Sequence, residues 1–390
     1  MDKPNIFKFG KKELTQDAIV AWIFECLKCN SCYRRVGVEF IKLIFGKDID
    51  SNEVELDPEG VKTQYYKMDV FAIVRINNTI HPIIVEDKTD SFLHSDQLAK
   101  YCEKVAKWIK KDKAYFNEIK KRFNNDNLVW GDIIYVYYKS GYVPNYENYK
   151  FKTLKKAAIT IVNSYEINLK VKEIYLDDMI NFLESLSLDD EMLKDYLNHL
   201  LDNKQLFDES YENALSLANQ DDYAKYYSNF AGLYRLFENA FGESPNINNH
   251  IYQGWASHDI FSLPSKINAN ENNNIFYTFR FEKCASSIKK YAYAFQLQQY
   301  RYERGTLGND KNALLDEKFN QAKAIQDLCV SIIKKMNTNV NVQIQELSNK
   351  KSYDGKIILK VFIEDDNSPK AVCSFINCFT SILTNSVNNL

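Results

Sequence analysis

One apolar segment that runs directly into three charges constrains the fold of this chain most. Residues 79–86 (TIHPIIVE) include an unbroken apolar run at 82–85, which is typical of a strand buried on both faces of a sheet. Glu86, Asp87 and Lys88 follow Val85 without a break. Because side chains alternate along a strand, Glu86 and Lys88 are expected on the same face. The segment therefore predicts a central strand whose end carries a carboxylate and an ammonium group together.

Helix and strand patterns flank this segment in an informative order. Two amphipathic helices are predicted at 13–28 and about 36–45, the second ending at Gly46. Further elements are expected as strands at 52–56, 65–76 and 79–86, a helix from 93 through 109 that continues toward 115, and a strand at 132–138. Asn77 and Asn78 form a predicted tight turn between two of these strands. The order predicts an α/β (α+β) fold with a mixed sheet and helices on both of its faces.

A chain of 390 residues is long enough for two domains. We expect a first domain at 1–185, a helical connector at 186–245 and a C-terminal α+β domain at 246–390. Within the last of these, 242–274 is predicted as loop because Asn, Ser and Pro are frequent there. The expected elements that follow are strands at 275–281 and 291–302, a helix at 316–335, a hairpin of 340–347 with 356–364, and a helix at 368–387.

Charge and composition limit the classes of function. The formal net charge is −2, so a nucleic-acid surface would have to be a local patch. The sequence has no run of about 18 apolar residues and no apolar leader stretch at its start. We therefore expect a cytoplasmic protein without a membrane partner, whose eight cysteines are reduced.

An acidic residue inside the preceding strand suggests a metal site. Asp69 lies in an apolar segment, where an isolated carboxylate is costly unless it has a partner. If the Asn77 turn pairs the two strands, Asp69 lies across from Glu86. Two carboxylates and the backbone carbonyl of Asp87 suit Mg²⁺ (or Mn²⁺), and Lys88 would then orient or polarise an attacking water. The alternative is an exposed strand end with surface ion pairs of little energetic value.

Three stretches together resemble a known family. They are ELTQDAIVAWI at 13–23, KMDVFAIVRI at 67–76 and IIVEDKTDSFLHSDQLAKY at 83–101. In this order they are similar to the PD-(D/E)xK nuclease superfamily, in particular to a bacterial stand-alone branch with an ELSQDA…EDKT…QLxxY pattern. The match covers about residues 5–140. It implies a restriction-endonuclease-like αβββαβ core that hydrolyses phosphodiester bonds with Mg²⁺.

The resemblance also implies roles for individual residues. Asp69 and Glu86 would be metal ligands, Lys88 the catalytic lysine, and Gln97 a contact to a phosphate or to the nucleophile. The ancillary positions that match the pattern are Glu13, Gln16, Asp17, His94 and Tyr101. Glu13 and Asp17 are one helical turn apart and would face the metal site, although carboxylates also favour a helix start for its dipole alone. His94 and Tyr101 are equally compatible with packing at the start of the following helix.

Two further patterns leave alternatives open. Cys26, Cys29 and Cys32 have a spacing that could hold zinc or an iron–sulfur cluster, but no fourth ligand is evident and two of the three fall on the apolar side of a helix end. A lysine-rich segment is either a phosphate-binding patch beside the site or a solvated helix face; its main members are Lys104, Lys107, Lys110 and Lys111.

The sequence thus predicts a metal-dependent nuclease, with DNA favoured as substrate. The resemblance places such stand-alone nucleases in genome conflict, for example in defence against phage. The alternative is a catalytically silent or trigger-activated protein that binds nucleic acid, or acts as a sensor, on the same fold. Self-association and a phage or host trigger protein stay open as partners, as does the role of the C-terminal domain. The sequence does not separate DNA from RNA or endonuclease from exonuclease.

Overall fold

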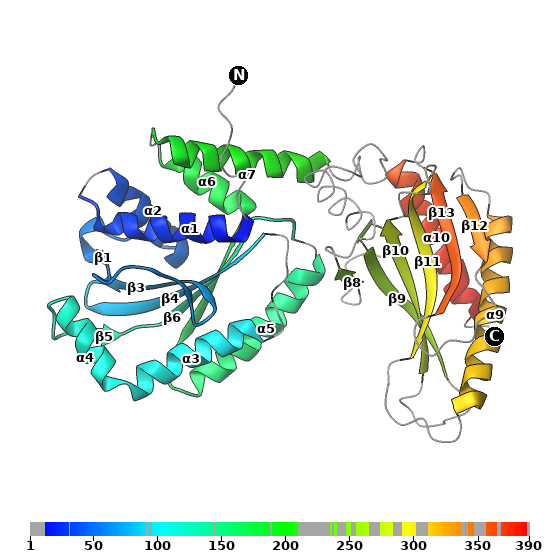
Figure 1. Cartoon of the computed structure of the whole chain (residues 1–390), viewed down its shortest axis with the longest axis horizontal. Helices are drawn as coiled ribbons and strands as arrows, with labels where there is room; N and C mark the ends of the chain where they lie inside the picture. Colours follow the sequence, from blue (N-terminus) through cyan, green and yellow to red (C-terminus); the bar gives the residue numbers. More distant parts are fainter. Residues whose placement is uncertain are drawn as a thin grey trace. The chain divides into compact units, whose positions relative to one another are not determined.

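A computed structural model describes residues 12–30, 32–89, 93, 96–143, 145–187, 189–209, 235, 238–239, 247–250, 255–264, 274–283, 291–301, 311–336, 340, 342–346, 356–364 and 368–387. The chain divides into two compact units (Figure 1). The first comprises residues 1–143 and 147–205, and the second comprises residues 144–146 and 206–390. Both units combine helices with a β-sheet, which confirms the predicted mixed α/β class.

The elements up to the end of α7 follow one another in this order: α1 (Lys12–Glu25), η2 (Cys26–Lys28), α2 (Tyr33–Phe45), η3 (Ser51–Glu53), β1 (Val54–Leu56), β2 (Lys62–Tyr65), β3 (Met68–Ile76), β4 (Thr79–Lys88), α3 (Gln97–Lys111), α4 (Lys113–Arg122), β5 (Val129–Trp130), β6 (Ile133–Lys139), α5 (Asn145–Asn163), β7 (Leu169–Tyr175), α6 (Leu176–Ser185) and α7 (Glu191–Glu209). Strand β4 occupies the middle of the sheet, whose strand order is β1-β3-β4-β6-β7. It pairs antiparallel with β3 and parallel with β6, so the sheet is mixed, as predicted.

Helices cover both faces of this sheet (Figure 1). On one face, α1, α2, α6 and α7 pack against alternate strand residues, including Ile83 and Val85 of β4. On the other face, α3, α4 and α5 pack against the intervening residues, including Ile84. Strand β4 is therefore buried on both sides, which explains its continuous apolar sequence.

Two tight turns connect the antiparallel strands of the sheet. Asn77 has a φ of 56° in the turn between β3 and β4, where Ile76 pairs with Thr79, as predicted. The turn between β2 and β3 was not predicted. It places Tyr66 and Lys67 at φ values of 53° and 72°, a conformation in which Asn and Gly are normally preferred.

Several elements differ from the sequence-based expectations. Helix α5 and strand β2 were not predicted, and the long helix expected from 93 is two helices that meet at Asp112. The Asp112 side chain accepts a hydrogen bond from the Tyr115 amide at 2.8 Å and so begins α4. The first unit also continues past the expected boundary at 185, because Leu193, Tyr196 and Leu200 of α7 pack into its core.

In the described part of the second unit, an antiparallel sheet is covered by helices. Its described strands are β8 (Ile247–His250), β9 (Trp255–Pro264), β10 (Asn274–Lys283), β11 (Tyr291–Arg301), β12 (Val342–Glu346) and β13 (Lys356–Glu364), in the spatial order β12-β13-β11-β10-β9-β8. Helices α9 (Lys311–Lys335) and α10 (Pro369–Val387) pack on the face that carries Tyr277 and Phe279. The hairpin of β12 and β13 confirms the prediction, whereas the loop expected at 242–274 was wrong for β8 and β9, which extend the sheet. Among the described helices, none has the length and apolarity that a membrane span requires.

Candidate metal centre

The pairing of β3 with β4 brings two acidic residues together at one end of the strands. Val70 lies opposite Val85 in the antiparallel register, so Asp69 and Glu86, one residue beyond this pair, are neighbours. Alternation places Glu86 and Lys88 on the same face as Ile84, which is the face covered by α3, α4 and α5. The hairpin register and the strand period are thus sufficient to gather the predicted side chains.

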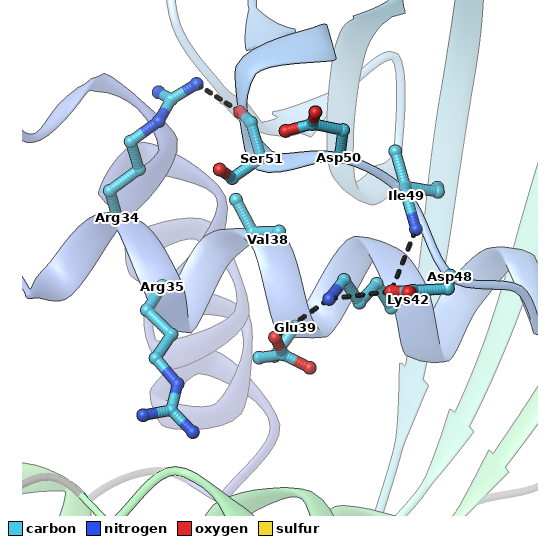
Figure 2. A pocket seen from close by; sticks show the side chains of 9 residues that line it. All are labelled: Arg34, Arg35, Val38, Glu39, Lys42, Asp48, Ile49, Asp50 and Ser51. Atoms are coloured by element: carbon cyan, nitrogen blue, oxygen red, sulfur yellow. Dashed lines mark hydrogen bonds and ion pairs between the residues drawn. The ribbon is translucent and has the colours of Figure 1, made fainter.

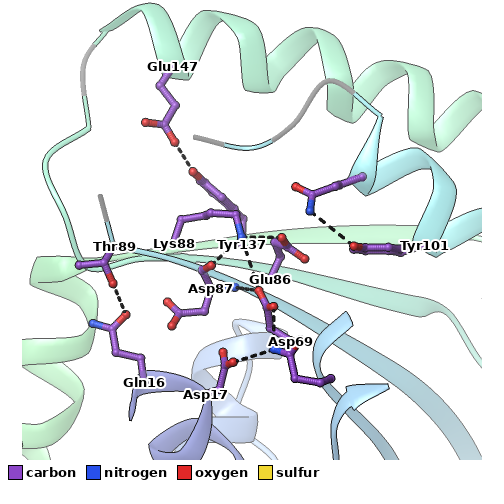
Figure 3. Close-up of polar contacts among 12 residues, drawn as sticks. Gln16, Asp17, Asp69, Glu86, Asp87, Lys88, Thr89, Tyr101, Tyr137 and Glu147 are labelled. Atoms are coloured by element: carbon purple, nitrogen blue, oxygen red, sulfur yellow. Dashed lines mark hydrogen bonds and ion pairs between the residues drawn. The ribbon is translucent and has the colours of Figure 1, made fainter. Parts of the chain in front are cut away.

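The oxygens of these residues converge on one ammonium group (Figure 3). Lys88 Nζ lies 2.6 Å from Glu86 Oε1 and 3.6 Å from Asp69 Oδ2. It also donates a hydrogen bond to the carbonyl oxygen of Asp87 at 2.9 Å. These are the three oxygen donors that the sequence predicts for Mg²⁺, and a positive charge already lies at the point between them.

Glu86 is a buried carboxylate with poor compensation. It is 0% exposed, and neither of its oxygens accepts a well-formed hydrogen bond from the described residues, although Lys88 forms a close ion pair. Burial raises the pKa of Glu86 to about 7, against the opposing effect of Lys88 and with a further contribution from Asp69. A divalent cation would supply the missing charge and the missing coordination, so the donor set fits Mg²⁺ or Mn²⁺.

The Asp69 carboxylate is held in place by two donors. The Asp87 amide donates to Asp69 Oδ2 at 2.9 Å, and Gln64 Nε2 lies 3.2 Å from Asp69 Oδ1. The same Gln64 nitrogen lies 3.0 Å from Asp17 Oδ2, which connects α1 to the site. Gln64 was not predicted, because nothing in its short polar strand marks it, whereas Asp17 was.

The other predicted residue of α1 serves the opposite side of the strand. Gln16 is assigned with its amide nitrogen 2.8 Å from Asp87 Oδ1 and 3.0 Å from Thr89 Oγ1, since the reverse orientation would turn its oxygen toward the carboxylate. Its oxygen accepts from the hydroxyl of Ser140. Figure 3 draws the reverse orientation, in which the Thr89 hydroxyl donates to the Gln16 oxygen at 3.0 Å. In either orientation Gln16 lies beside Thr89 and Asp87. Gln16 therefore anchors the strand end through the side chain of Asp87, whose carbonyl oxygen is the atom predicted to bind the metal.

The backbone at Gly141, after β6, closely approaches the backbone at the end of β4. A side chain at Gly141 would begin 1.7 Å from the carbonyl oxygen of Thr89. Only glycine fits there, so the turn after β6 lies directly against the end of β4.

Helix α3 supplies polar groups near the acids. Gln97, its first residue, lies with its amide nitrogen 3.4 Å from the hydroxyl of Tyr101. Burial and then the charge of Glu86 raise the pKa of Tyr101, which is consistent with a ring close to the carboxylate. His94 and the side chain of Glu13 lie outside the described residues, so their predicted ancillary roles have no structural counterpart here.

A second buried acid–lysine pair lies on the neighbouring strand and was not predicted. Lys139 is paired in register with Lys88, and its Nζ lies 3.5 Å from Glu147 Oε2. Glu147 lies in the first turn of α5, where it also accepts a hydrogen bond from the hydroxyl of Tyr137 (Figure 3). The pair was not predicted because α5 was not predicted. Without that helix, the sequence does not indicate that Glu147 lies near Lys139.

The cysteine pattern does not form a ligand cluster. Cys26 is buried, Cys29 is half-buried and Cys32 is exposed. Burial raises the pKa of Cys26 to about 12, with a smaller contribution from Cys29, which disfavours the thiolate that metals require. In the part of the chain that the structure describes, no group of three or more His, Cys, Asp or Glu side chains could hold a metal ion.

The lysine-rich segment divides into two sets. Lys107 and Lys110 form ion pairs with Glu103 at 2.9 Å and with Glu166 at 2.7 Å. Lys104 instead lies over the ring of Tyr66, at 3.5 Å from its centroid. These three of the four predicted lysines thus lie in different environments, and a role in binding phosphate stays a prediction.

A separate cavity of about 640 Å³ lies along α2 and the segment after it (Figure 2). Several of its charged groups are used in local contacts: Arg34 donates to the Ser51 carbonyl at 2.8 Å, and Lys42 lies 2.8 Å from Asp48 and 3.2 Å from Glu39. None of the predicted catalytic residues lines it.

Comparison with known proteins provides no family for this chain. No family model, no curated protein and no solved structure matches it.

Proposed function

We propose that the first unit is a metal-dependent phosphodiesterase that hydrolyses nucleic acid, with DNA favoured, on a restriction-endonuclease-like αβββαβ core. One observation carries the proposal. The carboxylates of Asp69 and Glu86 and the carbonyl of Asp87 surround a single point that holds a positive charge, the ammonium of Lys88. Such a point, lined by oxygen donors at the end of a buried strand, is suited to a hard divalent cation.

Asp69, Glu86 and the Asp87 carbonyl would hold the cation. When bound, Mg²⁺ or Mn²⁺ supplies Lewis acidity and lowers the pKa of a coordinated water. Other residues of the chain would orient the ligands and the attacking water. The Asp87 amide and Gln64 fix the orientation of Asp69. Lys88, anchored on the same face as both carboxylates, would hold the attacking water and offset the negative charge that develops on the phosphate.

Gln97 and Tyr101 extend this arrangement toward the substrate. Their polar groups lie together at the start of α3, and the field of Glu86 reaches Tyr101. An amide and a phenol in this position can donate hydrogen bonds to phosphate oxygens, which would orient the scissile bond.

The burial of the site favours one variant of this function. Glu86 is 0% exposed and Lys88 is 6% exposed, so a substrate phosphate reaches them only after some opening. A phage or host component that opens the site would make the enzyme trigger-activated, in keeping with a role in anti-phage defence. Cleavage assays with and without phage lysate separate this variant from a constitutive nuclease.

The decisive experiment is a cleavage assay on the purified full chain. DNA and RNA, single- and double-stranded, are incubated with Mg²⁺, with Mn²⁺ and with EDTA. We expect metal-dependent cleavage that Asp69→Ala and Lys88→Ala both abolish. Asp69→Ala should not lower the melting temperature, because it removes a like charge beside Glu86. Lys88→Ala should lower it, because Glu86 loses the ammonium group with which it pairs.

Glu173→Gln is the matched control. Glu173 pairs in register with Tyr137, which in turn pairs with Glu86, so it lies in the same row of the sheet two strands away. It interacts with Lys155 at 3.1 Å and not with Lys88, so its removal should leave cleavage intact. Cleavage by Asp69→Ala and Lys88→Ala at the wild-type rate would end the nuclease proposal.

A further inference from the structure

An aromatic surface lies next to the candidate metal centre. The ring of Tyr66 is centred 4.5 Å from that of Tyr65 and 5.3 Å from that of Trp108. Lys104 Nζ lies 3.5 Å from the Tyr66 centroid and 5.9 Å from that of Trp108. Tyr66 is nevertheless 52% exposed, an unusual position for a large ring. We call Tyr65, Tyr66, Lys104 and Trp108 the aromatic platform.

Both elements that build the platform also build the centre. Tyr66 precedes the metal-site residue Asp69 by three positions, in the turn that leads into the same strand, β3. On α3, Lys104 and Trp108 follow Tyr101 at spacings of three and seven residues, which places all three on the same side of the helix. At a rise of about 1.5 Å per residue, Trp108 lies roughly 10 Å from Tyr101 along the helix axis. The platform therefore lies within roughly 10 Å of Tyr101 along the helix.

The backbone at Tyr66 is costly. Tyr66 and the next residue, Lys67, both adopt left-handed conformations, with φ of 53° and 72°. A left-handed conformation costs a residue with a side chain about 1 kcal/mol or more, and Asn or Gly would avoid most of this cost. An aromatic ring and an ammonium group presented at such a turn are consistent with a role in binding, where strain tends to be retained.

The charges of the surface suit a polyanion. Lys104 lies over Tyr66, and Lys67 is exposed at the turn. Lys62 Nζ lies 5.0 Å from the Tyr65 centroid but is paired with Glu59 at 3.3 Å. Lys104 differs in this from Lys107 and Lys110 on the same helix, whose ammonium groups pair with carboxylates. Rings flanked by ammonium groups can stack on bases while the lysines contact the adjacent phosphates.

We propose that the aromatic platform binds a single-stranded segment of nucleic acid, with a base stacked on Tyr66 and a phosphate at Lys104. The inference rests on the proposed function and narrows its substrate class to single strands or frayed ends. Base faces are free to stack only when the strand is unpaired, whereas a duplex presents mainly phosphates and groove edges.

The test measures binding and not cleavage. The full chain is titrated in EDTA against a fluorescent single-stranded thymidine oligonucleotide and against a duplex of the same length, with anisotropy as the readout. We expect tighter binding of the single strand. Tyr66→Ala should weaken that binding at least about fivefold, Tyr66→Phe should restore most of it, and Lys104→Gln should weaken it to a smaller extent.

Lys107→Gln is the matched control for charge. It removes one positive charge from the same helix, but that charge is paired with Glu103 at 2.9 Å, so binding should change less than with Lys104→Gln. Melting temperatures establish that each variant is folded, and Lys104→Gln decides if Tyr66→Ala does not fold.

Equal affinity of wild type and both platform variants, or tighter binding of the duplex, would overturn the inference. Its failure is distinct from failure of the proposed function. A chain that binds single strands through Tyr66 but never cleaves them contradicts only the nuclease. A chain that cleaves with Mg²⁺ and ignores changes at Tyr66 and Lys104 contradicts only the platform.

Discussion

Two consecutive carboxylates of β4, both 0% exposed, lie in contrasting environments. Asp87 faces the α1 side of the sheet, where the amide of Gln16 can donate to it at 2.8 Å. Glu86 faces the α3 side, where neither oxygen accepts a well-formed hydrogen bond from the described residues and burial raises its pKa to about 7. A buried carboxylate with a fitted amide donor stabilises a fold, whereas one without such a donor is costly. The contrast indicates that Asp87 is structural and that Glu86 is kept for a cation.

Neutralising each acid in turn tests directly whether Glu86 and Asp87 have different roles. Glu86→Gln should reduce metal-dependent cleavage by roughly 1,000-fold, since a ligand of the proposed cation is lost. Asp87→Asn should keep cleavage within about tenfold of wild type, because only its carbonyl faces the centre. Rates are compared at saturating Mg²⁺ on the same substrate. Loss of cleavage in Asp87→Asn alone would reverse the two assignments.

The stability of the metal-free protein should depend on pH through Glu86. The pKa of Glu86 is raised from 4.5 to about 7 in the folded state, so the folded state binds this proton more tightly than the unfolded state. The free energy of unfolding should therefore fall as pH rises from about 4.5 to 7, by up to about 3 kcal/mol, and change little from this source above that.

Urea unfolding in EDTA at several pH values measures this effect. Subtracting the Glu86→Gln curve from the wild-type curve isolates it, since all other titrating groups are shared. Mg²⁺ should restore stability above pH 7, because the cation binds the ionised carboxylate. Parallel curves for wild type and Glu86→Gln would show that Glu86 is not the strained acid.

Much of the arrangement around these two acids follows from local rules. The Asn77 turn fixes the register of β3 against β4, and the period of two then assigns Glu86 and Lys88 to one face and Asp87 to the other. The mixed sheet follows from the order of the elements. No long-range information is needed for these statements, which is why the sequence was sufficient for them.

Other features of the structure depend on long-range contacts that no local sequence pattern indicates. Gln64 reaches Asp17 and Asp69 from a short polar strand with a φ of 52°, and no local pattern marks such a residue. Lys139 and Glu147 meet only because α5 packs on the sheet. Strand β9 lies in a stretch that resembles a loop because Asn, Ser and Pro are frequent in 242–274, but its pairing with β8 and β10 makes it a strand.

The core of the first unit also extends further than composition suggests. Helix α7 (EMLKDYLNHLLDNKQLFDE) is polar on average, and its apolar stripe of Leu193, Tyr196 and Leu200 is narrow. The hydroxyl of Tyr196 lies 2.6 Å from that of Tyr138 on β6. A domain boundary predicted from average polarity therefore falls at 185, before α7, although α7 packs into the core of the first unit.

The two tight turns of the sheet also differ, in this case in backbone strain. Substitutions there should have the smallest of the predicted effects. Lys67→Gly should raise the free energy of unfolding by about 1 kcal/mol, because glycine adopts the φ of 72° without the steric cost that lysine bears. Asn77→Gly is the matched control at a φ of 56°. It should gain nothing, because Asn tolerates this conformation and its side chain donates to Glu53 at 3.1 Å.

Urea unfolding at one pH compares the two variants, and oligonucleotide titration in EDTA at several salt concentrations adds the functional side. If Lys67 contacts a phosphate, Lys67→Gly should bind single strands more weakly, with a salt dependence reduced by about one ion. A variant that gains stability and loses affinity would show that the turn beside the candidate centre retains strain for binding. Stabilisation without loss of affinity would make the strain at Lys67 incidental, and the contrast between the two sides of the sheet would then be confined to the carboxylates.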